Sequence, residues 1–348
     1  MKIAFLISSL NAGGAERVVS LLANQLSLKH DIVIITLSVD KPFYQLNDSI
    51  RVMQLGALNS EKNPIKSILS NLVLIYKITS LIKSLKIRRL ICFMTTSNVL
   101  GIISGKFLSR INVTISERFN PLTNDIGYWN FFRKKLYKFS DRLVVQSDEI
   151  INYFKSFVDK RKIIIIPNPI KIVNTNNKKE KIILTVGRVD ANKNQEQIIR
   201  SFSKVKQRGW KLIICGDGSL INKLKDIVKA LNINDAVEFK GLVKNIEKQY
   251  RRASIFAFSS ISEGFPNVLL EGMNYGCACI STDCPTGPSA LIKNNINGFL
   301  IPVDDELSYT NHLQKLIDDE KLRNIFVSNS KSSLENHSIN KVAEKWIK

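Results

Sequence analysis

The chain contains 348 residues, which is too long for one ordinary hydrophobic core, so two domains are expected. Hydrophobic residues make up 44% of the chain, as in a globular protein, and no apolar run approaches the roughly 18 residues of a membrane-spanning helix. The formal net charge of +21 leaves nucleic acid, an anionic membrane surface and phosphorylated small substrates as the partner classes to consider.

The first half of the chain alternates between apolar strands and amphipathic helices. Its short apolar runs are typical of strands buried on both faces of a parallel sheet, and we predict them at residues 3–7, 32–37, 90–94 and 113–115. The first run lacks the small-residue cleavage site of a signal peptide and is expected to remain as a strand. A helix from Ala15 follows it, with Val18, Leu22 and Leu26 on one face. This alternation predicts a doubly wound α/β domain over residues 1–167.

Polar residues follow two of these strands, at the edge of the sheet where doubly wound domains bind ligands. Gly13 and Gly14 would let the backbone approach a phosphate closely, although a tight turn also explains them. They do not complete a G-x-G-x-x-G fingerprint, which disfavours a dinucleotide oxidoreductase. Arg118, in the sequence Ser116-Glu117-Arg118, stays protonated, so it can position a substrate but cannot act as a base.

Two basic segments of this half have helical periodicity, over residues 62–89 and 128–142. In each, lysines lie on one face, and in the second they lie beside an aromatic stripe. An ordinary helix with a solvated face is one explanation. The alternative is a basic amphipathic surface that lies at an anionic membrane or holds the pyrophosphate of a lipid-linked acceptor. The residues assigned to this surface are Lys62, Lys66, Lys134 and Lys138.

The domain boundary is predicted at the Pro-Asn-Pro sequence of residues 167–169, because the apolar pattern is lost directly after it. The alternation restarts at residues 182–186 and predicts a second doubly wound domain over residues 168–332. Arg188 and Lys193 lie in the loop after that strand, and two cations on a short loop suit a diphosphate, although loose surface charge is the alternative.

The stretch 258–287 is the centre of the second domain. A strand at 254–258, a loop at 259–266, a helix at 267–275 capped by Asn267, and a strand at 278–281 are expected. Backbone N–H groups at the helix start suit a phosphate. A carboxylate is an acceptor of hydroxyl groups, so Glu271 could bind a ribose and Glu263 a second sugar. By themselves, the two glutamates could equally be solvated.

The five cysteines lie mostly in apolar runs and have no histidine partner at metal-ligand spacing. They therefore predict reduced core thiols in a cytoplasmic protein and no metal site. They are Cys92, Cys215, Cys277, Cys279 and Cys284.

The sequence E-G-F-P-N-V-L-L-E, from Glu263 to Glu271, resembles the donor-binding signature of the retaining nucleotide-sugar glycosyltransferases of family 4. The arrangement G-R-x-x-x-x-K-N from Gly187 is similar to that family's diphosphate-binding motif. The resemblance covers nearly the whole chain and implies the GT-B fold, with two Rossmann-like domains facing each other across a cleft. It also implies that a C-terminal helix, at residues 333–348, packs back on the first domain.

The resemblance assigns roles to individual residues. Glu271 would hold the donor ribose, and Glu263 with the backbone of residues 264–267 would hold the donor sugar. Arg188 and Lys193, with the Gly14 amide, would stabilise the leaving diphosphate. The full donor site implied consists of Gly13, Gly14, Arg118, Arg188, Lys193, Gly216, Val243, Glu263, Gly264, Phe265, Pro266, Asn267, Val268 and Glu271.

Two members of this set differ from the others. Val243 would lie beside the nucleotide base, and Arg118 stands where the family often has a histidine that contacts the donor sugar. The residues implied in catalysis are Arg188, Lys193 and Glu263.

The function implied is transfer of a hexose or N-acetylhexosamine, with retention, from a nucleotide sugar that we expect to be a UDP-sugar. The acceptor would be a lipid-linked or polysaccharide glycan at the inner face of a bacterial membrane, with Ser116 to Pro121 part of that resemblance. No D-x-D sequence occurs, so no metal cofactor is expected. The alternatives are a nucleotide-sugar epimerase of the same fold, which needs no acceptor, and a basic nucleic-acid-binding protein.

Overall fold

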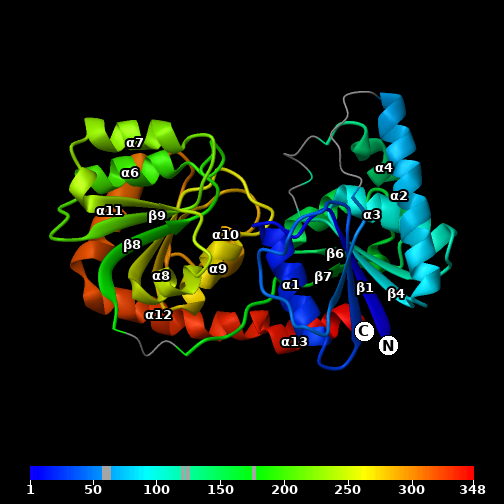
Figure 1. Ribbon diagram of the computed structural model, residues 1–348. Coiled ribbons are helices and arrows are strands. Elements are labelled where there is room, and N and C mark those ends of the chain that lie inside the picture. The colour runs from blue at the N-terminus through cyan, green and yellow to red at the C-terminus, as the bar shows by residue number, and fades with distance from the viewer. Residues whose placement is uncertain (57–63, 119–120, 122–125, 175–177) are drawn as a thin grey trace. The chain divides into compact units, whose positions relative to one another are not determined.

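The computed structural model describes residues 1–56, 64–118, 121, 126–174 and 178–348. Two compact α/β units divide the chain, and each has its own sheet and core (Figure 1). The first unit comprises Met1–Pro169 together with Ile339–Lys348, and the second comprises Ile170–Ser338. The first unit therefore continues to Pro169 rather than 167, and the returning segment begins at Ile339 rather than at 333.

A parallel sheet of seven strands forms the centre of the first unit, in the order β3-β2-β1-β4-β5-β6-β7. The order reverses between β1 and β4, as in a doubly wound fold. The sequence analysis did not predict β3, β6 or β7, because β3 is half exposed and β6 lies inside a predicted helix. The strands are β1 Lys2–Ile7, β2 Asp31–Thr36, β3 Arg51–Gln54, β4 Arg89–Phe93, β5 Asn112–Ser116, β6 Arg142–Val145 and β7 Ile163–Ile165.

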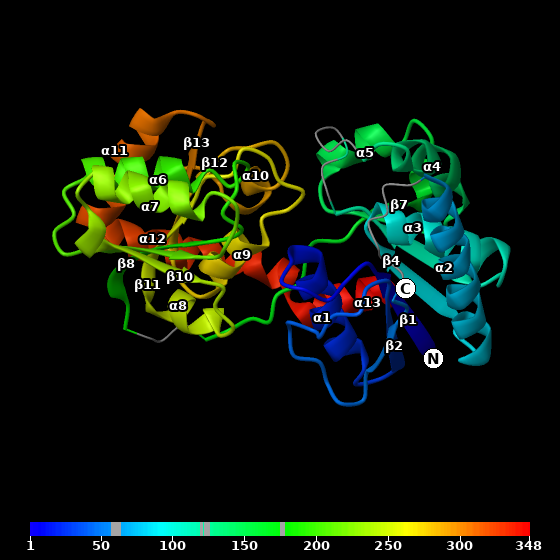
Figure 2. The same cartoon turned by 45° about the horizontal axis from the view of Figure 1, so that its top comes forward.

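Helices cover both faces of this sheet because the side chains of β1 alternate between two cores. Ile3, Phe5 and Ile7 pack with the helices α1 and α13 on one face, while Ala4 and Leu6 pack with α2 and α3 on the other (Figure 2). The helices of the first unit are α1 Gly14–Leu26, α2 Pro64–Ser84, α3 Thr95–Gly101, α4 Trp129–Leu136, α5 Asp148–Phe154 and α13 Ile339–Ile347.

Both predicted basic segments are shorter as helices than the sequence suggested. The run predicted through residue 89 ends at Ser84, because Arg89 begins β4. The run predicted through residue 142 is α4 followed by a 3₁₀ turn, Tyr137–Phe139, and Arg142 begins β6. Lys62 lies outside the described residues.

The second unit repeats the architecture with a parallel sheet of six strands, in the order β10-β9-β8-β11-β12-β13. Here the order reverses between β8 and β11. Ile183 of β8 packs under α6, α7 and α11, and its neighbours Ile182 and Leu184 pack under α8 and α9. The strands are β8 Glu180–Val186, β9 Lys211–Cys215, β10 Val237–Gly241, β11 Ala253–Phe258, β12 Ala278–Thr282 and β13 Phe299–Ile301. The helices are α6 Gln195–Lys204, α7 Ile221–Ala230, α8 Ile246–Arg252, α9 Asn267–Asn274, α10 Pro288–Leu291, α11 Glu306–Asp318 and α12 Glu320–Leu334.

The C-terminal helix belongs to the core of the first unit. In α13, Val342, Ala343 and Trp346 are buried, and α13 lies beside α1 (Figure 1). The Trp346 ring stacks on Phe93, with ring centroids 5.1 Å apart and an interplanar angle of 20°. Residues 333 and 334, which were expected in this helix, instead end α12 of the second unit.

All five cysteines are buried free thiols. Among the helices that the described residues form, none combines the length and hydropathy of a bilayer-crossing segment.

Candidate active site

The residues predicted for the donor in the second unit follow two neighbouring strands at the carboxyl edge of the sheet. One loop follows β8 and carries Arg188 and Lys193, and the other follows β11 and carries Glu263. Because the strand order reverses between β8 and β11, these loops flank the position where doubly wound sheets bind ligands.

The two loops are joined by an ion pair between Lys193 Nζ and Glu263 Oε1. Their side chains are 22% and 11% exposed, so the pair is largely shielded from water. Ser259 Oγ donates to the Lys193 carbonyl at 2.8 Å, and Asn192 Nδ2 donates to the Ser262 carbonyl at 2.8 Å. The sequence analysis assigned Lys193 and Glu263 to different groups of the donor and did not predict their pairing.

Arg188 has an anchored backbone and a free-standing side chain. Gln195 Nε2 donates to its carbonyl at 2.8 Å, but the side chain is 74% exposed. Its Nε lies 3.5 Å from the Asp190 carboxylate. At that exposure the ion pair contributes little stability, so the guanidinium is available to an anion.

Glu271 lies on α9 and is buried, while Asn267 and Val268 in the first turn are half buried. The helix start differs from the prediction: Pro266 is the N-cap, without a side-chain cap, and Asn267 is the first helical residue. The Asn267 amide donates to the Phe265 carbonyl at 3.0 Å, so this predicted phosphate donor is engaged within the loop.

A third loop, after β12, holds the Glu263 loop in place, which the sequence analysis did not predict. Thr286 Oγ1 donates to the Glu263 carbonyl. Thr286 has a φ of 61°, which is unusual for a β-branched residue, and such strain often occurs at functional sites. Its positive φ was not predictable from the sequence Thr-Gly-Pro.

Gly216 is required by a close backbone approach. A Cβ at this position would lie 1.8 Å from the Gly187 carbonyl oxygen, and its φ is 141°. Its amide donates to the Gly241 carbonyl at 2.8 Å. Gly216 thus packs the loops after β8, β9 and β10 together, and Val243, just beyond β10, is half buried at the same edge.

In the first unit, Gly13 and Gly14 lie where α1 begins after β1. A Cβ at Gly13 would lie 2.1 Å from Glu16 Oε2, and Ser9 Oγ donates to Glu16 Oε1 at 3.3 Å. The Glu16 carboxylate therefore lies against the start of the helix. Packing of this side chain is a local reason for glycine at position 13.

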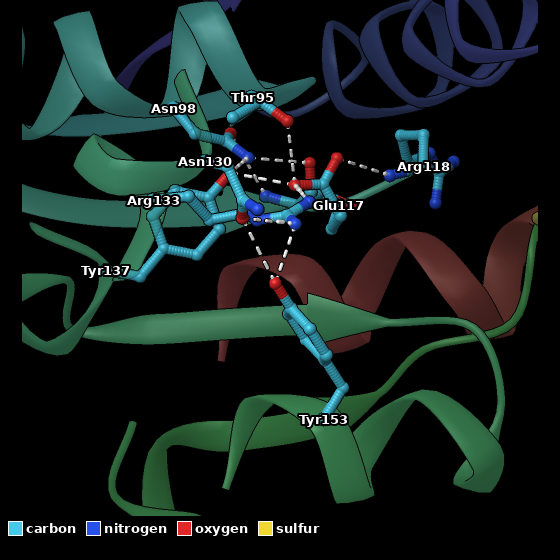
Figure 3. Close-up of polar contacts among 9 residues, drawn as sticks. Thr95, Asn98, Glu117, Arg118, Asn130, Arg133, Tyr137 and Tyr153 are labelled. Atoms are coloured by element: carbon cyan, nitrogen blue, oxygen red, sulfur yellow. Dashed lines mark hydrogen bonds and ion pairs between the residues drawn. The ribbon is translucent and has the colours of Figure 1, made fainter. Parts of the chain in front are cut away.

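A buried polar cluster surrounds Glu117, at the carboxyl end of β5 (Figure 3). Glu117 Oε2 accepts from Thr95 Oγ1 and Tyr137 Oη, both at 2.9 Å, and lies 3.8 Å from Arg133 Nη1. Arg133 Nη2 also donates to Tyr153 Oη at 2.7 Å. The Glu117 and Arg133 side chains are 1% and 2% exposed. The sequence analysis did not single out this cluster, because its members are scattered along the chain.

Electrostatics in this cluster follow from burial. Desolvation raises the pKa of Glu117, and Arg133 with the two hydroxyl donors partly offsets that rise. Arg118 follows Glu117 and its guanidinium lies 5.0 Å from the centroid of the Phe93 ring. Burial lowers the pKa of Arg118 to about 9, and the Glu117 charge opposes the shift, so the side chain stays cationic at neutral pH.

Three of the four lysines of the predicted basic surface lie among the described residues and are exposed, and so are many apolar side chains on the same elements. Lys66 lies on α2, and Lys134 and Lys138 lie on α4 and the turn after it. In α4 the buried residue is Arg133, while the aromatic residues point outward. The exposed apolar residues of α2 and of the α4 region are Ile68, Leu69, Leu72, Val73, Tyr76, Tyr128, Phe131, Phe132 and Phe139.

Comparison with known proteins places both units among glycosyltransferases. A family profile described as Glycosyltransferase Family 4 matches residues 12–173, and one described as Glycosyl transferases group 1 matches residues 168–333. The GalNAc-α-(1→4)-GalNAc-α-(1→3)-diNAcBac-PP-undecaprenol α-1,4-N-acetyl-D-galactosaminyltransferase of Campylobacter jejuni is 32% identical, over 100% of this chain and 98% of its own length.

A second Campylobacter jejuni enzyme, an N-acetylgalactosamine-N,N'-diacetylbacillosaminyl-diphospho-undecaprenol 4-α-N-acetylgalactosaminyltransferase, is 30% identical over 100% of this chain and 98% of its own. The crystal structure of Anabaena HepE in complex with UDP has a TM-score of 0.80 and 16% identity, covering 100% of this chain and 98% of that one. The expected pair of Rossmann-like domains is confirmed.

Proposed function

Because the chain belongs to the glycosyltransferases of family 4 and has their GT-B fold, we propose that it transfers a hexose or N-acetylhexosamine from a UDP-sugar to a lipid-linked glycan, with retention of configuration. Support for the donor and acceptor comes from similar proteins. Two relatives carry undecaprenyl-diphosphate acceptors in their names, and HepE, which is similar in fold, was crystallised with UDP.

The observation that carries the proposal is the ion pair between Lys193 and Glu263, which joins the loops after β8 and β11 at the reversal point of the second sheet, with Arg188 on the first of these loops. A nucleoside diphosphate needs cations for its phosphates and carboxylates for its sugar hydroxyls. The loops after β8 and β11 supply both kinds of group, and buried Glu271 adds a second carboxylate for the ribose.

In the proposed reaction the bond between the anomeric carbon and the diphosphate oxygen breaks, and negative charge builds on the leaving UDP. Arg188 and Lys193 stabilise that charge by preorganised electrostatics. The acceptor hydroxyl attacks the anomeric carbon from the same face and passes its proton to the leaving phosphate oxygen. We assign no covalent nucleophile and propose that transfer needs no metal ion.

We further propose that the first unit lies at an anionic membrane surface, at the inner face of the membrane. Exposed apolar and cationic side chains lie together on α2 and α4. Lys135 Nζ lies 5.9 Å from the Phe131 ring and Lys138 Nζ lies 5.2 Å from the Phe139 ring. Aromatic rings beside lysines suit the interface between lipid headgroups and acyl chains.

A transfer assay tests the function. A thermal-shift screen across nucleotide sugars would identify the donor, and transfer to a prenyl-diphosphate-linked glycan would then be measured. We expect Glu271→Ala to raise the donor KM, and Arg188→Ala to lower kcat by about 10²–10³-fold. Arg252→Ala is the matched control, because Arg252 pairs with Glu180 at the opposite edge of the same sheet.

Three results would contradict the proposal: no transfer with any UDP-sugar, sugar interconversion without an acceptor, or full activity in both Glu271→Ala and Arg188→Ala. The second result would indicate an epimerase.

A further inference from the structure

Results

Sequence analysis

The chain contains 348 residues, which is too long for one ordinary hydrophobic core, so two domains are expected. Hydrophobic residues make up 44% of the chain, as in a globular protein, and no apolar run approaches the roughly 18 residues of a membrane-spanning helix. The formal net charge of +21 leaves nucleic acid, an anionic membrane surface and phosphorylated small substrates as the partner classes to consider.

The first half of the chain alternates between apolar strands and amphipathic helices. Its short apolar runs are typical of strands buried on both faces of a parallel sheet, and we predict them at residues 3–7, 32–37, 90–94 and 113–115. The first run lacks the small-residue cleavage site of a signal peptide and is expected to remain as a strand. A helix from Ala15 follows it, with Val18, Leu22 and Leu26 on one face. This alternation predicts a doubly wound α/β domain over residues 1–167.

Polar residues follow two of these strands, at the edge of the sheet where doubly wound domains bind ligands. Gly13 and Gly14 would let the backbone approach a phosphate closely, although a tight turn also explains them. They do not complete a G-x-G-x-x-G fingerprint, which disfavours a dinucleotide oxidoreductase. Arg118, in the sequence Ser116-Glu117-Arg118, stays protonated, so it can position a substrate but cannot act as a base.

Two basic segments of this half have helical periodicity, over residues 62–89 and 128–142. In each, lysines lie on one face, and in the second they lie beside an aromatic stripe. An ordinary helix with a solvated face is one explanation. The alternative is a basic amphipathic surface that lies at an anionic membrane or holds the pyrophosphate of a lipid-linked acceptor. The residues assigned to this surface are Lys62, Lys66, Lys134 and Lys138.

The domain boundary is predicted at the Pro-Asn-Pro sequence of residues 167–169, because the apolar pattern is lost soon after it. The alternation restarts at residues 182–186 and predicts a second doubly wound domain over residues 168–332. Arg188 and Lys193 lie in the loop after that strand. Two cations on a short loop suit a diphosphate, although loose surface charge is the alternative.

The stretch 258–287 is the centre of the second domain. A strand, a loop, a helix capped by Asn267 and a second strand are expected at residues 254–258, 259–266, 267–275 and 278–281. Backbone N–H groups at the helix start suit a phosphate. A carboxylate accepts hydrogen bonds from hydroxyl groups, so Glu271 could bind a ribose and Glu263 a second sugar. By themselves, the two glutamates could equally be solvated.

The five cysteines lie mostly in apolar runs and have no histidine partner at metal-ligand spacing. They therefore predict reduced core thiols in a cytoplasmic protein and no metal site. They are Cys92, Cys215, Cys277, Cys279 and Cys284.

The sequence E-G-F-P-N-V-L-L-E, from Glu263 to Glu271, resembles the donor-binding signature of the retaining nucleotide-sugar glycosyltransferases of family 4. The arrangement G-R-x-x-x-x-K-N from Gly187 is similar to that family's diphosphate-binding motif. The resemblance covers nearly the whole chain and implies the GT-B fold, with two Rossmann-like domains facing each other across a cleft. It also implies that a C-terminal helix, at residues 333–348, packs back on the first domain.

The resemblance assigns roles to individual residues. Glu271 would hold the donor ribose, and Glu263 with the backbone of residues 264–267 would hold the donor sugar. Arg188 and Lys193, with the Gly14 amide, would stabilise the leaving diphosphate. The full donor site implied consists of Gly13, Gly14, Arg118, Arg188, Lys193, Gly216, Val243, Glu263, Gly264, Phe265, Pro266, Asn267, Val268 and Glu271.

Two members of this set differ from the others. Val243 would lie beside the nucleotide base, and Arg118 stands where the family often has a histidine that contacts the donor sugar. The residues implied in catalysis are Arg188, Lys193 and Glu263.

The function implied is transfer of a hexose or N-acetylhexosamine, with retention, from a nucleotide sugar that we expect to be a UDP-sugar. The acceptor would be a lipid-linked or polysaccharide glycan at the inner face of a bacterial membrane, and the stretch from Ser116 to Pro121 is part of that resemblance. No D-x-D sequence occurs, so no metal cofactor is expected. The alternatives are a nucleotide-sugar epimerase of the same fold, which needs no acceptor, and a basic nucleic-acid-binding protein.

Overall fold

The computed structural model describes residues 1–56, 64–118, 121, 126–174 and 178–348. Two compact α/β units divide the chain, and each has its own sheet and core (Figure 1). The first unit comprises Met1–Pro169 together with Ile339–Lys348, and the second comprises Ile170–Ser338. The first unit therefore continues to Pro169 rather than 167, and the returning segment begins at Ile339 rather than at 333.

A parallel sheet of seven strands forms the centre of the first unit, in the order β3-β2-β1-β4-β5-β6-β7. The order reverses between β1 and β4, as in a doubly wound fold. The sequence analysis did not predict β3, β6 or β7, because β3 is largely exposed and β6 begins inside a predicted helix. The strands are β1 Lys2–Ile7, β2 Asp31–Thr36, β3 Arg51–Gln54, β4 Arg89–Phe93, β5 Asn112–Ser116, β6 Arg142–Val145 and β7 Ile163–Ile165.

Helices cover both faces of this sheet because the side chains of β1 alternate between two cores. Ile3, Phe5 and Ile7 pack with the helices α1 and α13 on one face, while Ala4 and Leu6 pack with α2 and α3 on the other (Figure 2). The helices of the first unit are α1 Gly14–Leu26, α2 Pro64–Ser84, α3 Thr95–Gly101, α4 Trp129–Leu136, α5 Asp148–Phe154 and α13 Ile339–Ile347.

Both predicted basic segments are shorter as helices than the sequence suggested. The run predicted through residue 89 ends at Ser84, because Arg89 begins β4. The run predicted through residue 142 is α4 followed by a 3₁₀ turn, Tyr137–Phe139, and Arg142 begins β6. Lys62 lies outside the described residues.

The second unit repeats the architecture with a parallel sheet of six strands, in the order β10-β9-β8-β11-β12-β13. Here the order reverses between β8 and β11. Ile183 of β8 belongs to the core under α6, α7 and α11, and its neighbours Ile182 and Leu184 belong to the core under α8 and α9. The strands are β8 Glu180–Val186, β9 Lys211–Cys215, β10 Val237–Gly241, β11 Ala253–Phe258, β12 Ala278–Thr282 and β13 Phe299–Ile301. The helices are α6 Gln195–Lys204, α7 Ile221–Ala230, α8 Ile246–Arg252, α9 Asn267–Asn274, α10 Pro288–Leu291, α11 Glu306–Asp318 and α12 Glu320–Leu334.

The C-terminal helix belongs to the core of the first unit. In α13, Val342, Ala343 and Trp346 are buried, and α13 lies beside α1 (Figure 1). The Trp346 ring stacks on Phe93, with ring centroids 5.1 Å apart and an interplanar angle of 20°. Residues 333 and 334, which were expected in this helix, instead end α12 of the second unit.

All five cysteines are buried free thiols. Among the helices that the described residues form, none combines the length and hydropathy of a bilayer-crossing segment.

Candidate active site

The residues predicted for the donor in the second unit follow two neighbouring strands at the carboxyl edge of the sheet. One loop follows β8 and carries Arg188 and Lys193, and the other follows β11 and carries Glu263. Because the strand order reverses between β8 and β11, these loops flank the position where doubly wound sheets bind ligands.

The two loops are joined by an ion pair between Lys193 Nζ and Glu263 Oε1. Their side chains are 22% and 11% exposed, so the pair is largely shielded from water. Ser259 Oγ donates to the Lys193 carbonyl at 2.8 Å, and Asn192 Nδ2 donates to the Ser262 carbonyl at 2.8 Å. The sequence analysis assigned Lys193 and Glu263 to different groups of the donor and did not predict their pairing.

Arg188 has an anchored backbone and an exposed side chain. Gln195 Nε2 donates to its carbonyl at 2.8 Å, but the side chain is 74% exposed. Its Nε lies 3.5 Å from the Asp190 carboxylate. At that exposure the ion pair contributes little stability, so the guanidinium is available to an anion.

Glu271 lies on α9 and is buried, while Asn267 and Val268 in the first turn are half buried. The helix start differs from the prediction: Pro266 is the N-cap, without a side-chain cap, and Asn267 is the first helical residue. The Asn267 amide donates to the Phe265 carbonyl at 3.0 Å, so this predicted phosphate donor is engaged within the loop. Gly264 is half buried in the same loop.

A third loop, after β12, holds the Glu263 loop in place, which the sequence analysis did not predict. Thr286 Oγ1 donates to the Glu263 carbonyl. Thr286 has a φ of 61°, which is unusual for a β-branched residue, and such strain clusters at functional sites. Sequence pattern alone does not reveal this conformation, because a Thr-Gly-Pro sequence places the positive φ more naturally at the glycine.

Gly216 is required by a close backbone approach. A Cβ at this position would lie 1.8 Å from the Gly187 carbonyl oxygen, and its φ is 141°. Its amide donates to the Gly241 carbonyl at 2.8 Å. Gly216 thus packs the loops after β8, β9 and β10 together, and Val243, just beyond β10, is half buried at the same edge.

In the first unit, Gly13 and Gly14 lie where α1 begins after β1. A Cβ at Gly13 would lie 2.1 Å from Glu16 Oε2, and Ser9 Oγ donates to Glu16 Oε1 at 3.3 Å. The Glu16 carboxylate therefore lies against the start of the helix. Packing of this side chain is a local reason for glycine at position 13.

A buried polar cluster surrounds Glu117, at the carboxyl end of β5 (Figure 3). Glu117 Oε2 accepts from Thr95 Oγ1 and Tyr137 Oη, both at 2.9 Å, and lies 3.8 Å from Arg133 Nη1. Arg133 Nη2 also donates to Tyr153 Oη at 2.7 Å. The Glu117 and Arg133 side chains are 1% and 2% exposed. The sequence analysis did not find this cluster, because its members are scattered along the chain.

Electrostatics in this cluster follow from burial. Desolvation raises the pKa of Glu117, and Arg133 with the two hydroxyl donors partly offsets that rise. Arg118 follows Glu117, and its guanidinium lies 5.0 Å from the centroid of the Phe93 ring. Burial lowers the pKa of Arg118 to about 9, and the Glu117 charge opposes the shift, so the side chain stays cationic at neutral pH.

Three of the four lysines of the predicted basic surface lie among the described residues and are exposed, and so are many apolar side chains on the same elements. Lys66 lies on α2, Lys134 on α4 and Lys138 in the turn after it. In α4 the buried residue is Arg133, while the aromatic residues are largely exposed. The exposed apolar residues of α2 and of the α4 region are Ile68, Leu69, Leu72, Val73, Tyr76, Tyr128, Phe131, Phe132 and Phe139.

Comparisons with known proteins match both halves of the chain. A family profile described as Glycosyltransferase Family 4 matches residues 12–173, and one described as Glycosyl transferases group 1 matches residues 168–333. The GalNAc-α-(1→4)-GalNAc-α-(1→3)-diNAcBac-PP-undecaprenol α-1,4-N-acetyl-D-galactosaminyltransferase of Campylobacter jejuni is 32% identical, over 100% of this chain and 98% of its own length.

A second Campylobacter jejuni enzyme, an N-acetylgalactosamine-N,N'-diacetylbacillosaminyl-diphospho-undecaprenol 4-α-N-acetylgalactosaminyltransferase, is 30% identical over 100% of this chain and 98% of its own. The crystal structure of Anabaena HepE in complex with UDP has a TM-score of 0.80 and 16% identity, covering 100% of this chain and 98% of that one. The expected pair of Rossmann-like domains is confirmed.

Proposed function

Because the chain belongs to the glycosyltransferases of family 4 and has their GT-B fold, we propose that it transfers a hexose or N-acetylhexosamine from a UDP-sugar to a lipid-linked glycan, with retention of configuration. Support for the donor and acceptor comes from similar proteins. Two relatives carry undecaprenyl-diphosphate acceptors in their names, and HepE, which is similar in fold, was crystallised with UDP.

The observation that carries the proposal is the ion pair between Lys193 and Glu263, which joins the loops after β8 and β11 at the reversal point of the second sheet, with Arg188 on the first of these loops. A nucleotide sugar needs cations for its phosphates and acceptors for its sugar hydroxyls. The loops after β8 and β11 supply both kinds of group, and buried Glu271 adds a second carboxylate for the ribose.

In the proposed reaction the bond between the anomeric carbon and the diphosphate oxygen breaks, and negative charge builds on the leaving UDP. Arg188 and Lys193 stabilise that charge by preorganised electrostatics. The acceptor hydroxyl attacks the anomeric carbon from the same face and passes its proton to the leaving phosphate oxygen. We assign no covalent nucleophile and propose that transfer needs no metal ion.

We further propose that the first unit lies at an anionic membrane surface, at the inner face of the membrane. Exposed apolar and cationic side chains occur together on α2 and α4. Lys135 Nζ lies 5.9 Å from the centroid of the Phe131 ring, and Lys138 Nζ lies 5.2 Å from that of Phe139. Aromatic rings beside lysines suit the interface between lipid headgroups and acyl chains.

A transfer assay tests the function. A thermal-shift screen across nucleotide sugars would identify the donor, and transfer to a prenyl-diphosphate-linked glycan would then be measured. We expect Glu271→Ala to raise the donor KM, and Arg188→Ala to lower kcat by about 10²–10³-fold. Arg252→Ala is the matched control, because Arg252 pairs with Glu180 at the opposite edge of the same sheet.

Three results would contradict the proposal: no transfer with any UDP-sugar, sugar interconversion without an acceptor, or full activity in both Glu271→Ala and Arg188→Ala. The second result would indicate an epimerase.

A further inference from the structure

Arg118 is a half-buried residue whose guanidinium tip is buried. Both terminal nitrogens, Nη1 and Nη2, are shielded from water and have no hydrogen-bond partner among the described residues. A guanidinium carries five N–H donors in a planar fork, and leaving those on Nη1 and Nη2 unsatisfied in a buried site costs stability. A group held in this way is suited to an acceptor that comes from outside the chain.

The charges nearby do not neutralise it. Glu117 is the adjacent carboxylate, but its Oε2 accepts from Thr95 and Tyr137 and faces Arg133. Its Oε1 accepts from the Arg118 backbone amide at 3.3 Å, not from the guanidinium (Figure 3). The Glu117 carboxylate thus lies near both arginines, but its hydrogen bond with Arg118 is to the backbone amide and its side-chain ion pair is with Arg133.

The support beneath Arg118 is rigid. Its guanidinium lies over the Phe93 ring, whose own ring stacks on buried Trp346. Met94, directly after Phe93, has a φ of 76°, a strained conformation for a residue with a side chain. Strain persists where the surrounding structure enforces it, which is common at ligand sites.

We propose that Arg118 is the phosphate receptor of the first unit, binding two oxygens of one phosphate group through Nη1 and Nη2. The planar fork matches a phosphate in a bidentate manner, and Phe93 fixes its plane. This differs from the sugar contact that the family resemblance implies for the position.

The proposal rests on the proposed function in one respect, the choice of diphosphates as natural ligands. The phosphate could belong to the nucleotide donor or to a prenyl-diphosphate acceptor, and the chemistry at Arg118 is the same in both cases. Calorimetry on the full chain separates them, with UDP and farnesyl diphosphate as probes and with uridine and farnesol as their uncharged counterparts.

Arg118→Met should lower the affinity for one of the two diphosphates by roughly 10- to 100-fold, because charge-assisted hydrogen bonds are lost. Arg118→Lys should recover part of that affinity, since it keeps the charge but loses the fork. The same methionine variant should raise the melting temperature of the ligand-free protein, because it removes an unsatisfied buried cation. A merely structural arginine would give the opposite shift.

Arg51→Met is the matched control, because Arg51 pairs with Asp31 at the other edge of the same sheet and should leave both affinities unchanged. Unchanged affinity of Arg118→Met for both diphosphates would overturn the proposal, and so would a lower melting temperature with no loss of affinity. If Glu271→Ala loses UDP binding while Arg118→Met binds both diphosphates as tightly as the wild type, the assignment of Arg118 as a phosphate receptor is wrong and the proposed function stands. If the wild-type protein binds neither diphosphate, both the role of Arg118 and the proposed function are wrong.

Discussion

The Lys193–Glu263 pair places opposite charges where the proposed function needs a phosphate ligand and a sugar ligand. In the described structure the Lys193 ammonium and the Glu263 carboxylate form an ion pair with each other. A bound donor would therefore compete with Glu263 for the Lys193 ammonium, and this competition gives the pair a measurable role.

Glu263→Gln should tighten UDP binding by roughly two- to tenfold, because it frees Lys193 and removes a negative charge near the diphosphate. The same variant should lower kcat, since glutamine is a weaker acceptor of sugar hydroxyls. Calorimetry with UDP and steady-state kinetics with the full donor measure the two effects. Weaker UDP binding in Glu263→Gln would show that Glu263 supports the cation site rather than competing for it.

Glu117 has a pKa above its usual value of 4.5, because burial of its charge outweighs the help from Arg133. Its contribution to stability is therefore fully present below pH 4.5 and is lost as the pH rises through the folded-state pKa. Glu117→Gln lacks this titration, so its free energy of unfolding should rise relative to wild type between pH 4.5 and neutral pH. Urea unfolding of both proteins across that range tests the sign, and a falling difference would mean that Arg133 dominates the carboxylate.

At the scale of elements, α2 and α4 depart from the usual rule that the apolar face of a helix is the buried one. Leu74, Ile78 and Ile82 of α2 face the core, but a second apolar stripe that includes Leu72 and Tyr76 is exposed. In α4, Arg133 is buried because Glu117 and Tyr153 supply its partners. The aromatic rings of Phe131 and Phe132 are left exposed, where they can contact another surface.

Leu72→Glu should reduce flotation of the protein with anionic vesicles by about tenfold or more, because it puts a charge into the apolar stripe of α2. The exposed position should leave the melting temperature almost unchanged. Ser84→Glu is the control, since it adds the same charge at an exposed polar position of the same helix. Equal flotation of Leu72→Glu and the wild type would exclude this stripe as the membrane contact.

For the whole molecule, the division into two units means that two separate segments of the chain, Met1–Pro169 and Ile339–Lys348, form the first unit. Residues 339–348 complete its core through Trp346, while the second unit has its own buried tryptophan, Trp210. Each unit therefore has a core that a mutation can weaken separately.

Trp346→Ala should destabilise the first unit by about 3–5 kcal/mol, the usual cost of deleting a large buried ring. Differential scanning calorimetry should show one of two transitions shifted down. Trp210→Ala should shift the other transition. If both variants lowered the same transition, the two units would unfold as one cooperative body.

The sequence by itself determined the doubly wound architecture of both units, because buried parallel strands are short local apolar runs that can be read without knowledge of the partners. It also predicted Arg188, Lys193 and Glu263 just beyond strand ends, and they lie in the loops after β8 and β11. It failed at β3, whose short sequence is half polar, and at β6, which begins inside a predicted helix.

Only the tertiary structure decided which charges meet. Lys193 and Glu263 lie far apart in the chain and pair because β8 and β11 are neighbours in the sheet. Arg133 is buried with partners, while the terminal nitrogens of Arg118 have no hydrogen-bond partner among the described residues, for the same reason: whether a charge can leave water depends on groups that folding brings from distant segments. No local sequence pattern shows which distant groups will surround a charge, so the buried cluster around Glu117 could be found only in the folded structure.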